Sequence, residues 1–553
     1  MRIQAANMQP LLLAALLVLL ALLVTTRPGY AADAVVGTGD PASCTETALD
    51  AALTTAGSGG GVITFNCGAA VATITLSTLK VINLGNVTID GGGRIILDAN
   101  YSERHFFAGP IIFRLQNITL QRGDSLVSGG AIEASGAQVF LENVQILDNQ
   151  AAVAGGAIYC YNGELTITNS RFTGNTAPTA GAIYNDGCLV DIQNTTFQAN
   201  EATGAIGRGG AIENAALGTL RVRTSQFLTN QALDGGGVYN AGGATAMLTA
   251  VTLRGNGGGH GGGIENSGTL TLTDSLLDGN SVTGSGGGLW NTSGTAFVQR
   301  TTFTGNTAAE GGGVNTYGSS LVMEDVNLTG NVANNTHGGA LYHSSGVAFI
   351  TNATISGNQA SAPGGNGGGV YQSSDDNLTL TNVTLANNQA GLFGGGLYHY
   401  GRYAILTNVT LGNNTAGAAG NAIYEDAPLT PGSPGLVQIA NSVIFGAAVN
   451  CDGALFQSLG HNISKGSCAA LSDATDQENI AGDLLLSALS NNGGLFAMQT
   501  FLPQAGSPLI DAADAGQCPA QDQRGAGRVG VCDIGAVEYG AAAYRLHLPL
   551  VKN

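Results

Sequence analysis

The sequence has little charge, few aromatic rings and few cysteines, and each shortage narrows the class of protein. Only 10% of its 553 residues are charged and 6% are aromatic. Disordered chains are also poor in aromatic residues, but they lack the high and periodic aliphatic content of this one. Eight cysteines are too few to build a disulfide-based fold of this length. The chain is therefore expected to fold around an aliphatic core.

Basic residues are also scarce. The chain has 19 Lys and Arg residues against 37 Asp and Glu residues, which gives a net charge of −18. Proteins that bind nucleic acids neutralise phosphates with clustered basic side chains. The charge balance therefore argues against nucleic acid as a partner.

Long apolar runs are absent except near the start of the chain. Leu11 to Val24 is apolar, Arg2 precedes it, and Gly29-Tyr30-Ala31 offers a small-residue cleavage site, so residues 1–31 are interpreted as a secretory signal peptide. An uncleaved anchor is the alternative, but 14 apolar residues fall short of the roughly 20 that span a bilayer. Cleavage would remove two positive charges and take the net charge from −18 to −20. The mature chain is expected to be extracellular, secreted or attached to the cell surface, with no transmembrane helix.

Glycine, in contrast, is abundant, with 86 residues. Much of it falls in a repeated phrase, Gly-Gly-aliphatic-aromatic, as in Gly155-Gly156-Ala157-Ile158-Tyr159. The aliphatic anchors of this phrase recur every 25 to 29 residues, at Ile132, Ile158, Ile183, Ile212, Val238, Ile264, Leu289, Val314, Leu341, Val370, Leu397 and Ile423. A fixed period of this length predicts a repeat architecture.

The repeat unit is predicted to be a β coil. A second phrase ending in Asn keeps the same period, as in Phe172-Thr173-Gly174-Asn175. The segments between the two phrases alternate aliphatic residues with threonine, as in Leu270-Thr271-Leu272-Thr273, which is typical of β-strands. Glycine at this density would destabilise helical repeats. Because parallel crossovers are right-handed, we expect an all-β, right-handed, single-stranded parallel β-helix. Three kinds of side chain should each form a stack along the axis of the β-helix: the aliphatic anchors, the Asn amides and the phenylalanines Phe172, Phe197, Phe227 and Phe303.

The two ends depart from the repeat. Ser43 to Leu53 is predicted to be a short helix that caps the first coil, with Ser43 and Glu46 as a capping box. The expected divisions are a signal peptide (1–31), an N-terminal cap and first coils (32–100), β-helix repeats (101–450), a C-terminal cap (451–540) and a tail (541–553). Four disulfides are expected from proximity in the sequence or in successive coils: Cys44–Cys67, Cys160–Cys188, Cys451–Cys468 and Cys518–Cys532.

Three motifs carry a family resemblance. The Gly-Gly-Ala-Ile and Phe-x-x-Asn phrases resemble the repeat of polymorphic outer-membrane proteins, within the pectate-lyase-like β-helix superfamily. Cys44-Thr45-Glu46-Thr47-Ala48-Leu49 resembles the CSLREA segment of secreted β-helix proteins, although its middle differs. Residues 506–538, with Asp522-Gln523-Arg524-Gly525, resemble the C-terminal cap named choice-of-anchor Q. The resemblance implies the fold strongly and an activity weakly, since the superfamily includes enzymes, adhesins and phage spikes.

No catalytic or metal-binding constellation stands out. Within the repeats the acidic residues are scattered, at Glu133, Asp186, Glu213, Asp234, Glu265, Asp278 and Glu310. Arg402 lies one repeat period after Asp376 in the sequence. Asp375, Asp376 and Arg402 are interpreted as a surface turn with a solvated ion pair. Gly259-His260-Gly261 matches a motif of galacturonan hydrolases, but it precedes the paired Asp residues and is interpreted as a chance match. We therefore assign no catalytic residue, no metal and no cofactor.

One row of residues suggests a ligand. By strand alternation the residue after each anchor should face outward. Most of these positions are aromatic: Tyr159, Tyr184, Tyr239, Trp290, Tyr342, Tyr371, Tyr398 and Tyr424. Stacked aromatic rings also stabilise coils on their own account, so a structural ladder remains open beside a ligand-binding stripe.

The sequence favours a surface β-helix protein that binds and does not catalyse, as an adhesin or glycan-binding stalk whose partner is a polysaccharide or a cell-surface glycan. A polysaccharide lyase or glycoside hydrolase with an unlocated site is one alternative. A passive structural surface protein, with no ligand, is the other. A carboxylate cluster with a basic neighbour on one face would favour the enzyme, and a bare aromatic stripe would favour binding.

Overall fold

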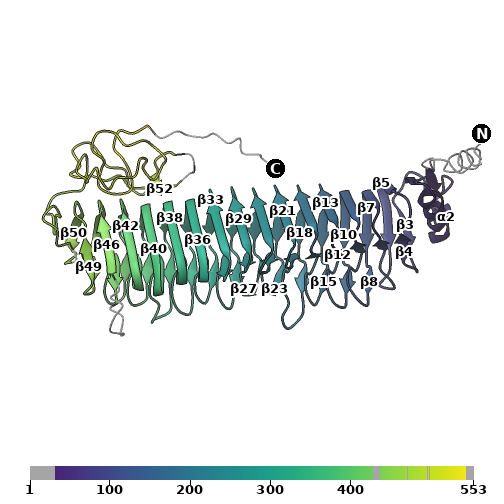
Figure 1. Cartoon of the computed structure of the whole chain (residues 1–553), viewed down its shortest axis with the longest axis horizontal. Helices are drawn as coiled ribbons and strands as arrows, with labels where there is room; N and C mark the ends of the chain where they lie inside the picture. Colours follow the sequence, from purple (N-terminus) through teal and green to yellow (C-terminus); the bar gives the residue numbers. More distant parts are fainter. Residues whose placement is uncertain (1–31, 427–435, 470, 495, 497, 543–553) are drawn as a thin grey trace, which may run out of the picture.

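The chain forms one elongated parallel β-helix (Figure 1). The computed structural model describes residues 32–426 and 436–542, apart from residues 470, 495 and 497. The proposed signal peptide and nearly all of the predicted tail lie outside these described residues. No helix in the described part of the chain is long and apolar enough to cross a membrane.

Each coil contributes strands that pair in parallel with the equivalent strands one coil later. In one coil these are β12 (Ile158–Tyr161), β13 (Glu164–Thr168), β14 (Arg171–Thr173) and β15 (Thr176–Ala177). Their partners are β16 (Ile183–Asp186), β17 (Leu189–Gln193), β18 (Thr196–Gln198) and β19 (Glu201–Ala202). Ile158 pairs with Ile183, so the sequence period is the coil period. The predicted parallel β-helix is confirmed.

Two stacks of strands frame the candidate site. The first begins at the aliphatic anchors and comprises β6 (Phe106–Ala108), β9 (Ile132–Ser135), β12, β16, β20 (Ile212–Asn214), β24 (Val238–Asn240), β28 (Ile264–Asn266), β32 (Leu289–Thr292), the starts of β36 (Val314–Thr329), β38 (Leu341–Ser356), β40 (Val370–Ala386) and β42 (Leu397–Thr407), and β45 (Ile423–Glu425). The second is a separate sheet of short strands: β8 (Asp124–Ser125), β11 (Gln150–Ala151), β15, β19, β23 (Gln231–Asp234), β27 (Gly257–His260), β31 (Ser281–Val282), β35 (Thr307–Ala308), β37 (Val332–Ala333), β39 (Gln359–Ala360), β41 (Gln389–Ala390) and β44 (Thr415–Ala416). Turns that contain the Gly-Gly pairs join the second stack to the first.

The remaining strands complete the coils and pair in the same parallel manner. They are β1 (Ala34–Val36), β2 (Gly61–Phe65), β3 (Ala72–Thr75), β4 (Lys80–Ile82), β5 (Val87–Asp98), β7 (Ile112–Gln121), β10 (Gln138–Leu147), β21 (Thr219–Arg223), β22 (Gln226–Leu228), β25 (Thr245–Thr249), β26 (Thr252–Arg254), β29 (Thr269–Thr273), β30 (Leu276–Asp278), β33 (Thr295–Gln299), β34 (Thr302–Thr304), β43 (Thr410–Gly412), β46 (Leu436–Ala440), β47 (Val443–Val449), β48 (Cys451–Asp452), β49 (Phe456–Ser458) and β50 (Ile463–Ser467). In the described chain, only β51 (Ser490–Asn491) and β52 (Gln499–Thr500) pair as antiparallel strands. Parallel pairing up to β50 means that the last coil lies within the range that the sequence assigns to the C-terminal cap.

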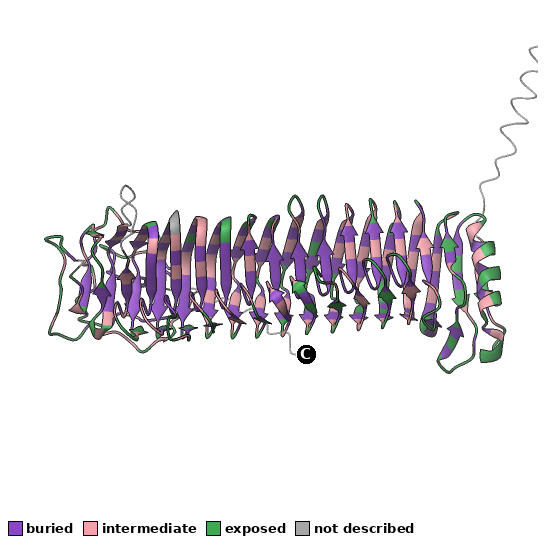
Figure 2. Ribbon diagram, turned by 90° about the horizontal axis from the view of Figure 1, so that it is seen from below, coloured by how far each residue is buried: buried purple, intermediate pink, exposed green. Residues whose placement is uncertain are grey.

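The core is a continuous stack of aliphatic and aromatic side chains inside the coil, with polar residues outside (Figure 2). All twelve anchors are fully buried. Phe172, Phe197 and Phe227 stack with ring centroids 4.9 and 5.0 Å apart. Phe303 is also buried but lies between Leu277 and Leu328, so it does not continue that stack. The predicted phenylalanine stack is therefore three rings long.

The Asn of the second phrase forms a buried amide ladder. The Nδ2 of Asn256 donates to Oδ1 of Asn280, at 3.1 Å, and to the Phe227 carbonyl, at 2.9 Å. The same pattern runs along the coils through Asn149, Asn175, Asn200, Asn230, Asn256, Asn280, Asn306, Asn331, Asn358, Asn388 and Asn414. Each amide satisfies backbone groups that the corner would otherwise leave buried and unpaired.

The Gly-Gly pair is required for two different reasons. Gly155 has φ +63°, a conformation that residues with a side chain rarely adopt. A Cβ atom at Gly156 would collide with the carbonyl oxygen of Gly181 in the next coil. The first glycine therefore makes the turn and the second allows neighbouring coils to approach.

The N-terminal helix exists but begins later than predicted. Helix α2 spans Glu46–Gly57, preceded by a 3-10 turn, η1 (Pro41–Ser43). Its N-cap is Thr45, which accepts a bond from the Ala48 amide, so the assignment of Ser43 as the cap is wrong. Glu46 does not close a capping box; it binds Ser77, Thr78 and Lys80 of the first coil. The glutamate therefore fastens the helix to the solenoid.

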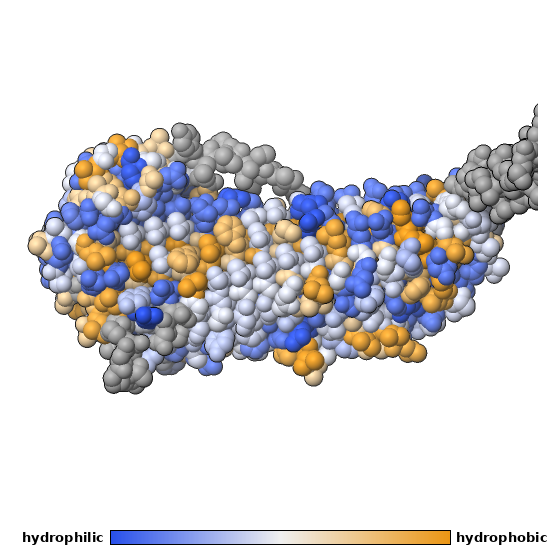
Figure 3. Space-filling view, viewed as in Figure 1, coloured by the Kyte–Doolittle hydropathy of each residue, from blue (hydrophilic) through white to orange (hydrophobic). Residues whose placement is uncertain are grey.

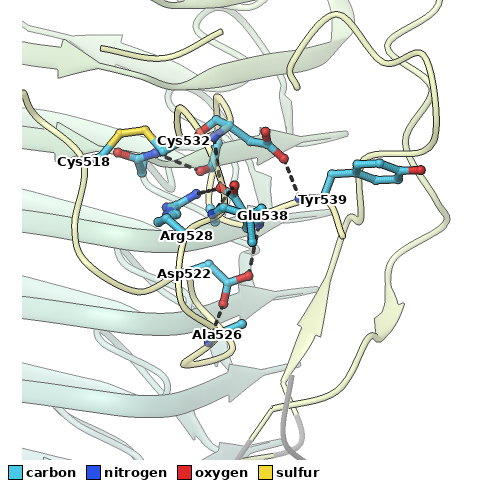
Figure 4. A network of polar contacts seen from close by, with 12 residues as sticks. Cys518, Asp522, Ala526, Arg528, Cys532, Glu538 and Tyr539 are labelled. Atoms are coloured by element: carbon cyan, nitrogen blue, oxygen red, sulfur yellow. Dashed lines mark hydrogen bonds and ion pairs between the residues drawn. A yellow bond between two sulfur atoms is a disulfide. The ribbon is translucent and has the colours of Figure 1, made fainter. Parts of the chain in front are cut away.

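The C-terminal cap folds back along the flank of the coils and does not extend the axis (Figure 1). Gln523 donates to the Ala353 carbonyl at 2.8 Å and accepts from the Thr384 hydroxyl. A buried network holds the cap together, in which Asp522 accepts from the amides of Ala526 and Glu538, and Arg528 binds Glu538 at 3.1 Å (Figure 4). All four disulfides expected from the sequence are present: Cys44–Cys67, Cys160–Cys188, Cys451–Cys468 and Cys518–Cys532.

Candidate functional site

The residues that follow the anchors lie in register and form one row along the solenoid, here called the aromatic row. Tyr159 pairs with Tyr184, and Tyr371 pairs with Tyr398. From N- to C-terminus the row reads Glu133, Tyr159, Tyr184, Glu213, Tyr239, Glu265, Trp290, Asn315, Tyr342, Tyr371, Tyr398 and Tyr424. All eight aromatic residues singled out in the sequence are thus in one line, although not as an unbroken series.

Most tyrosines of the row use their ring faces on one another. Tyr342, Tyr371, Tyr398 and Tyr424 stack in sequence, with centroids 5.0, 4.8 and 5.6 Å apart and ring planes within 14° of parallel. Tyr159 and Tyr184 form a second stack, at 5.4 Å. Tyr239 and Tyr398 are buried, because the Arg208 guanidinium covers the first and the rings of Tyr371 and Tyr424 cover the second, so the row is closed to solvent at those two positions. The stacked tyrosines act chiefly as a ladder that joins coils.

A second row packs against the first. It is formed by the residues just before the Gly-Gly turns and is here called the turn row. His260 lies 4.5 Å from the Trp290 ring, His337 lies 4.4 Å from Tyr371, and the Arg208 guanidinium lies 4.9 Å from the centre of Tyr239. In each pair the turn-row residue contacts the aromatic row of the next coil. The turn row therefore covers part of the predicted stripe.

Between the two tyrosine stacks, the rows bring together a group here called the acidic section: Arg208, Glu213, Asp234, His260, Glu265 and Trp290. Glu213, Tyr239, Glu265 and Trp290 are successive in register, about 4.8 Å apart per coil. In the turn row Arg208 pairs with Asp234, and Asp234 pairs with His260. Three carboxyl groups thus lie within the electrostatic influence of one guanidinium.

The carboxyl groups of the acidic section are poorly compensated. Glu265 is 4% exposed, and its Oε2 atom has no hydrogen-bond partner. The only ion pair that Arg208 forms in the described chain is with Asp234, at 4.0 Å, and its Nε atom donates no hydrogen bond. Glu213 is better placed, because it accepts a bond from the Thr179 hydroxyl. Buried polar atoms without partners are costly, so this section is the least satisfied part of the row.

Burial disfavours the charged forms of these acids. It raises the pKa of Glu265 to about 9, with the Asp234 charge adding to the effect and Arg208 opposing it. Burial also raises the pKa of Glu213 and that of Asp234. Burial therefore favours the protonated form of Glu265. Elsewhere in the row, burial and the bond to Asp186 raise the pKa of the Tyr159 hydroxyl, which is a structural consequence of packing.

Other sites considered in the sequence stay apart from this group. Arg402 lies 5.3 Å from the ring of its neighbour Tyr403, and the side chains of Asp375 and Asp376 lie outside the described part. Among the described residues no three His, Cys, Asp or Glu side chains are grouped closely enough to hold a metal ion.

Glu213, Asp234 and Glu265 are scattered in the sequence and the His260 motif is interpreted there as chance, yet the fold places all four in three successive coils. The placement of two of the carboxyl groups was predictable, because Glu213 and Glu265 each directly follow an aliphatic anchor. The turn row gave no such signal, because its residue types vary from coil to coil.

The comparisons with known proteins bear on the repeat. The model of the Chlamydia polymorphic membrane protein repeat matches residues 143–161, which run from the end of one coil through the next Gly-Gly turn. The chain is thus a parallel β-helix, and the matched segment of it is similar to that repeat. Among solved structures, the crystal structure of PfbA, a surface adhesin of Streptococcus pneumoniae, is similar over 69% of this chain and 92% of that chain, at 15% identity and a TM-score of 0.31. No curated protein matches.

Proposed function

We propose that the chain is a surface-displayed β-helix protein that binds a polysaccharide through the aromatic row, at the section around Trp290. The observation that carries the proposal is the break in the tyrosine ladder. In the row Trp290 lies between Glu265 and Asn315, so neither of its two neighbours in the row is aromatic. An indole bordered by a carboxyl group, an amide and the His260 imidazole suits a sugar, whose ring carries apolar C–H faces and polar hydroxyls.

Export to the surface is supported by several independent features. The chain begins with a signal-like segment, the structure holds four disulfides, and the repeat is of a membrane-protein type. The resemblance of residues 44–49 to the CSLREA segment and that of residues 506–538 to choice-of-anchor Q belong to the same proposal. On the face of the molecule that Figure 3 shows, apolar side chains form separate patches among polar ones, which suits a solvated stalk.

The test uses the intrinsic fluorescence of the protein. Trp290 is the only tryptophan in the chain, so its emission reports on this section alone. A panel of neutral, acidic and basic polysaccharides should contain at least one that shifts the emission, and Trp290→Ala should lose that ligand on a glycan array. Tyr371→Leu, within the stacked ladder, is the matched control and should keep it. If Trp290→Ala binds every ligand as the parent does, the row is a structural ladder only.

A second candidate function, glycoside hydrolase, is favoured by one observation. Burial and the Asp234 charge raise the pKa of Glu265 to about 9, and a carboxyl group with a raised pKa is what a general acid needs. A reducing-end assay on the polysaccharide that binds would test it. Release of reducing ends by the parent but not by Glu265→Gln would favour the enzyme, and no release by either would favour a binding protein.

A further inference from the structure

The acidic and basic side chains of the acidic section are unequal in number. Asp234, Glu265 and Glu213 offer three carboxyl groups to one guanidinium, that of Arg208, and to the His260 imidazole, which acts on Asp234. The section therefore holds more acidic than basic side chains. A similar shortage is corrected elsewhere in the same row, where Glu133 pairs with Arg104.

Two atoms of the section lack partners. Oε2 of Glu265 is buried and accepts no hydrogen bond, and Nε of Arg208 is buried and donates none. The two residues that border Glu265 are less fixed, because the Arg208 side chain is 43% exposed and that of Asp234 is 20% exposed, and they meet only at 4.0 Å. Both side chains therefore reach solvent, whereas the Glu265 carboxyl that they influence is buried.

Building on the proposed function, we infer that this section binds a sugar that carries a free amino group, with its ammonium between Asp234 and Glu265 and its ring against Trp290. An ammonium group offers three donors and a positive charge, and two carboxylates with an adjacent aromatic face are the surroundings that favour it. The ligand class is a polysaccharide of amino sugars that are not acetylated.

The proton balance of binding is simple. When the amine arrives neutral, the O–H bond of the Glu265 carboxyl breaks and an N–H bond forms, which leaves an ammonium beside a carboxylate. When it arrives as an ammonium, the Glu265 proton leaves to solvent. In both cases binding gives the buried carboxyl a charge partner in place of its proton.

The negative charge of the chain argues against an acidic polysaccharide as the ligand. A polymer of uronic acids would bring carboxylates to a section that already holds three carboxyl groups, and to a chain of net charge −18. A neutral sugar would fit the Trp290 ring but would leave the carboxyl pair uncompensated. An amino sugar satisfies both the ring and the carboxyls.

The experiment compares two ligands that differ only at the nitrogen: a hexamer of glucosamine and a hexamer of N-acetylglucosamine. Affinities are measured by calorimetry and by Trp290 emission at pH 6. The full chain should bind the free-amine hexamer about tenfold more tightly, or better, as expected for charge-assisted hydrogen bonds. Glu265→Gln and Asp234→Asn should reduce that ratio to near one. Glu265→Gln keeps the shape and neutrality of the protonated side chain, so the fold is preserved.

Glu133→Gln is the matched control, since Glu133 is a glutamate of the same row with its own basic partner, and it should leave the ratio unchanged. Equal affinity for the two hexamers, both lost in Trp290→Ala, would overturn this inference and leave the proposed function standing. Tighter binding of a galacturonate hexamer would also overturn it, as would equal binding of hexalysine, since charge alone would then explain the result. Binding of no glycan at all would overturn both.

Discussion

Asparagine stabilises two corners of each coil by different means. At the buried corner, Asn256 uses its amide to bond both neighbouring coils, donating to Asn280 and accepting from the backbone amide and the side chain of Asn230. At the outer corner, Asn143 adopts φ +53° and is exposed, and its Nδ2 donates to Oδ1 of Asn117 at 2.8 Å, where water can replace the bond. The first role depends on hydrogen bonds that water cannot replace, and the second depends on tolerance of a left-handed backbone.

Replacement of the buried amide should therefore be much more costly than replacement of the exposed one. Asn256→Ala leaves the Asn230 amide and the Phe227 carbonyl buried without this partner, and we expect a loss of about 3 kcal/mol, since each unsatisfied group costs about 1–3 kcal/mol. Asn143→Gly keeps the positive φ and should cost less than about 1 kcal/mol. Denaturant unfolding followed by circular dichroism measures both, and equal losses would contradict the ladder's role.

Single residues also mark the limit of prediction from sequence. The anchors, the Asn ladder and the row of Tyr159, Tyr184 and their successors were predictable, because each repeats one residue class at one period. The turn row was not, since Arg208, Asp234 and His260 share no chemistry. The burial of Tyr239 was also not predictable, because strand alternation says which way a side chain points but not what packs over it.

At the scale of elements, the two caps close the solenoid in different ways. Helix α2 covers the first coil with Leu49, Ala52 and Ala56 buried, and Lys80 bridges it to that coil through Glu46 and Asp50. The C-terminal cap docks on the side of the coils through Gln523 and Asn408. The sequence predicted a helix at one end and an irregular cap at the other. It gave no sign of the lateral docking, which depends on contacts between residues more than 100 positions apart.

The C-terminal cap should loosen as the pH rises. Burial raises the pKa of Asp533 to about 6, with the charges of Glu538 and Asp511 adding to the effect. A folded-state pKa above the unfolded value means that the proton stabilises the fold, so this contribution is complete below about pH 4 and is lost as the pH rises through 6. Asp473 and Asp514 act in the opposite sense, since hydrogen bonds lower the pKa of each, but they titrate below this window.

Hydrogen exchange of residues 506–539 measures this effect. Protection factors, corrected for the intrinsic rate, should fall between pH 4.5 and pH 7.5 in the parent chain. Asp533→Asn, which resembles the protonated acid, should remove most of that fall. Protection that rises over this range, or an unchanged slope in Asp533→Asn, would mean that Asp533 does not govern the docking of the cap.

For the whole molecule, stability depends on neighbouring coils and little on distant ones. Each strand of the coil pairs only with the strands one coil before and one coil after, as β28 pairs with β24 and β32. A solenoid of this kind behaves as a one-dimensional array, in which a local fault spreads through adjacent interfaces. The period in the sequence is enough to predict this organisation, because it fixes which residues are neighbours.

Ile264→Asp tests that view. Ile264 is fully buried between Val238 and Leu289, and an unpaired carboxylate there should cost on the order of several kcal/mol. Because coupling runs through nearest neighbours, hydrogen exchange should show lost protection in peptides from residues 238–290, while α2 and the coils near Phe113 keep theirs. Thr269→Asp is the control, since Thr269 is exposed in the same coil and should change neither region. Uniform loss of protection from end to end would show that the solenoid unfolds as one cooperative unit, and no loss near residue 264 would contradict the inward placement of the anchors.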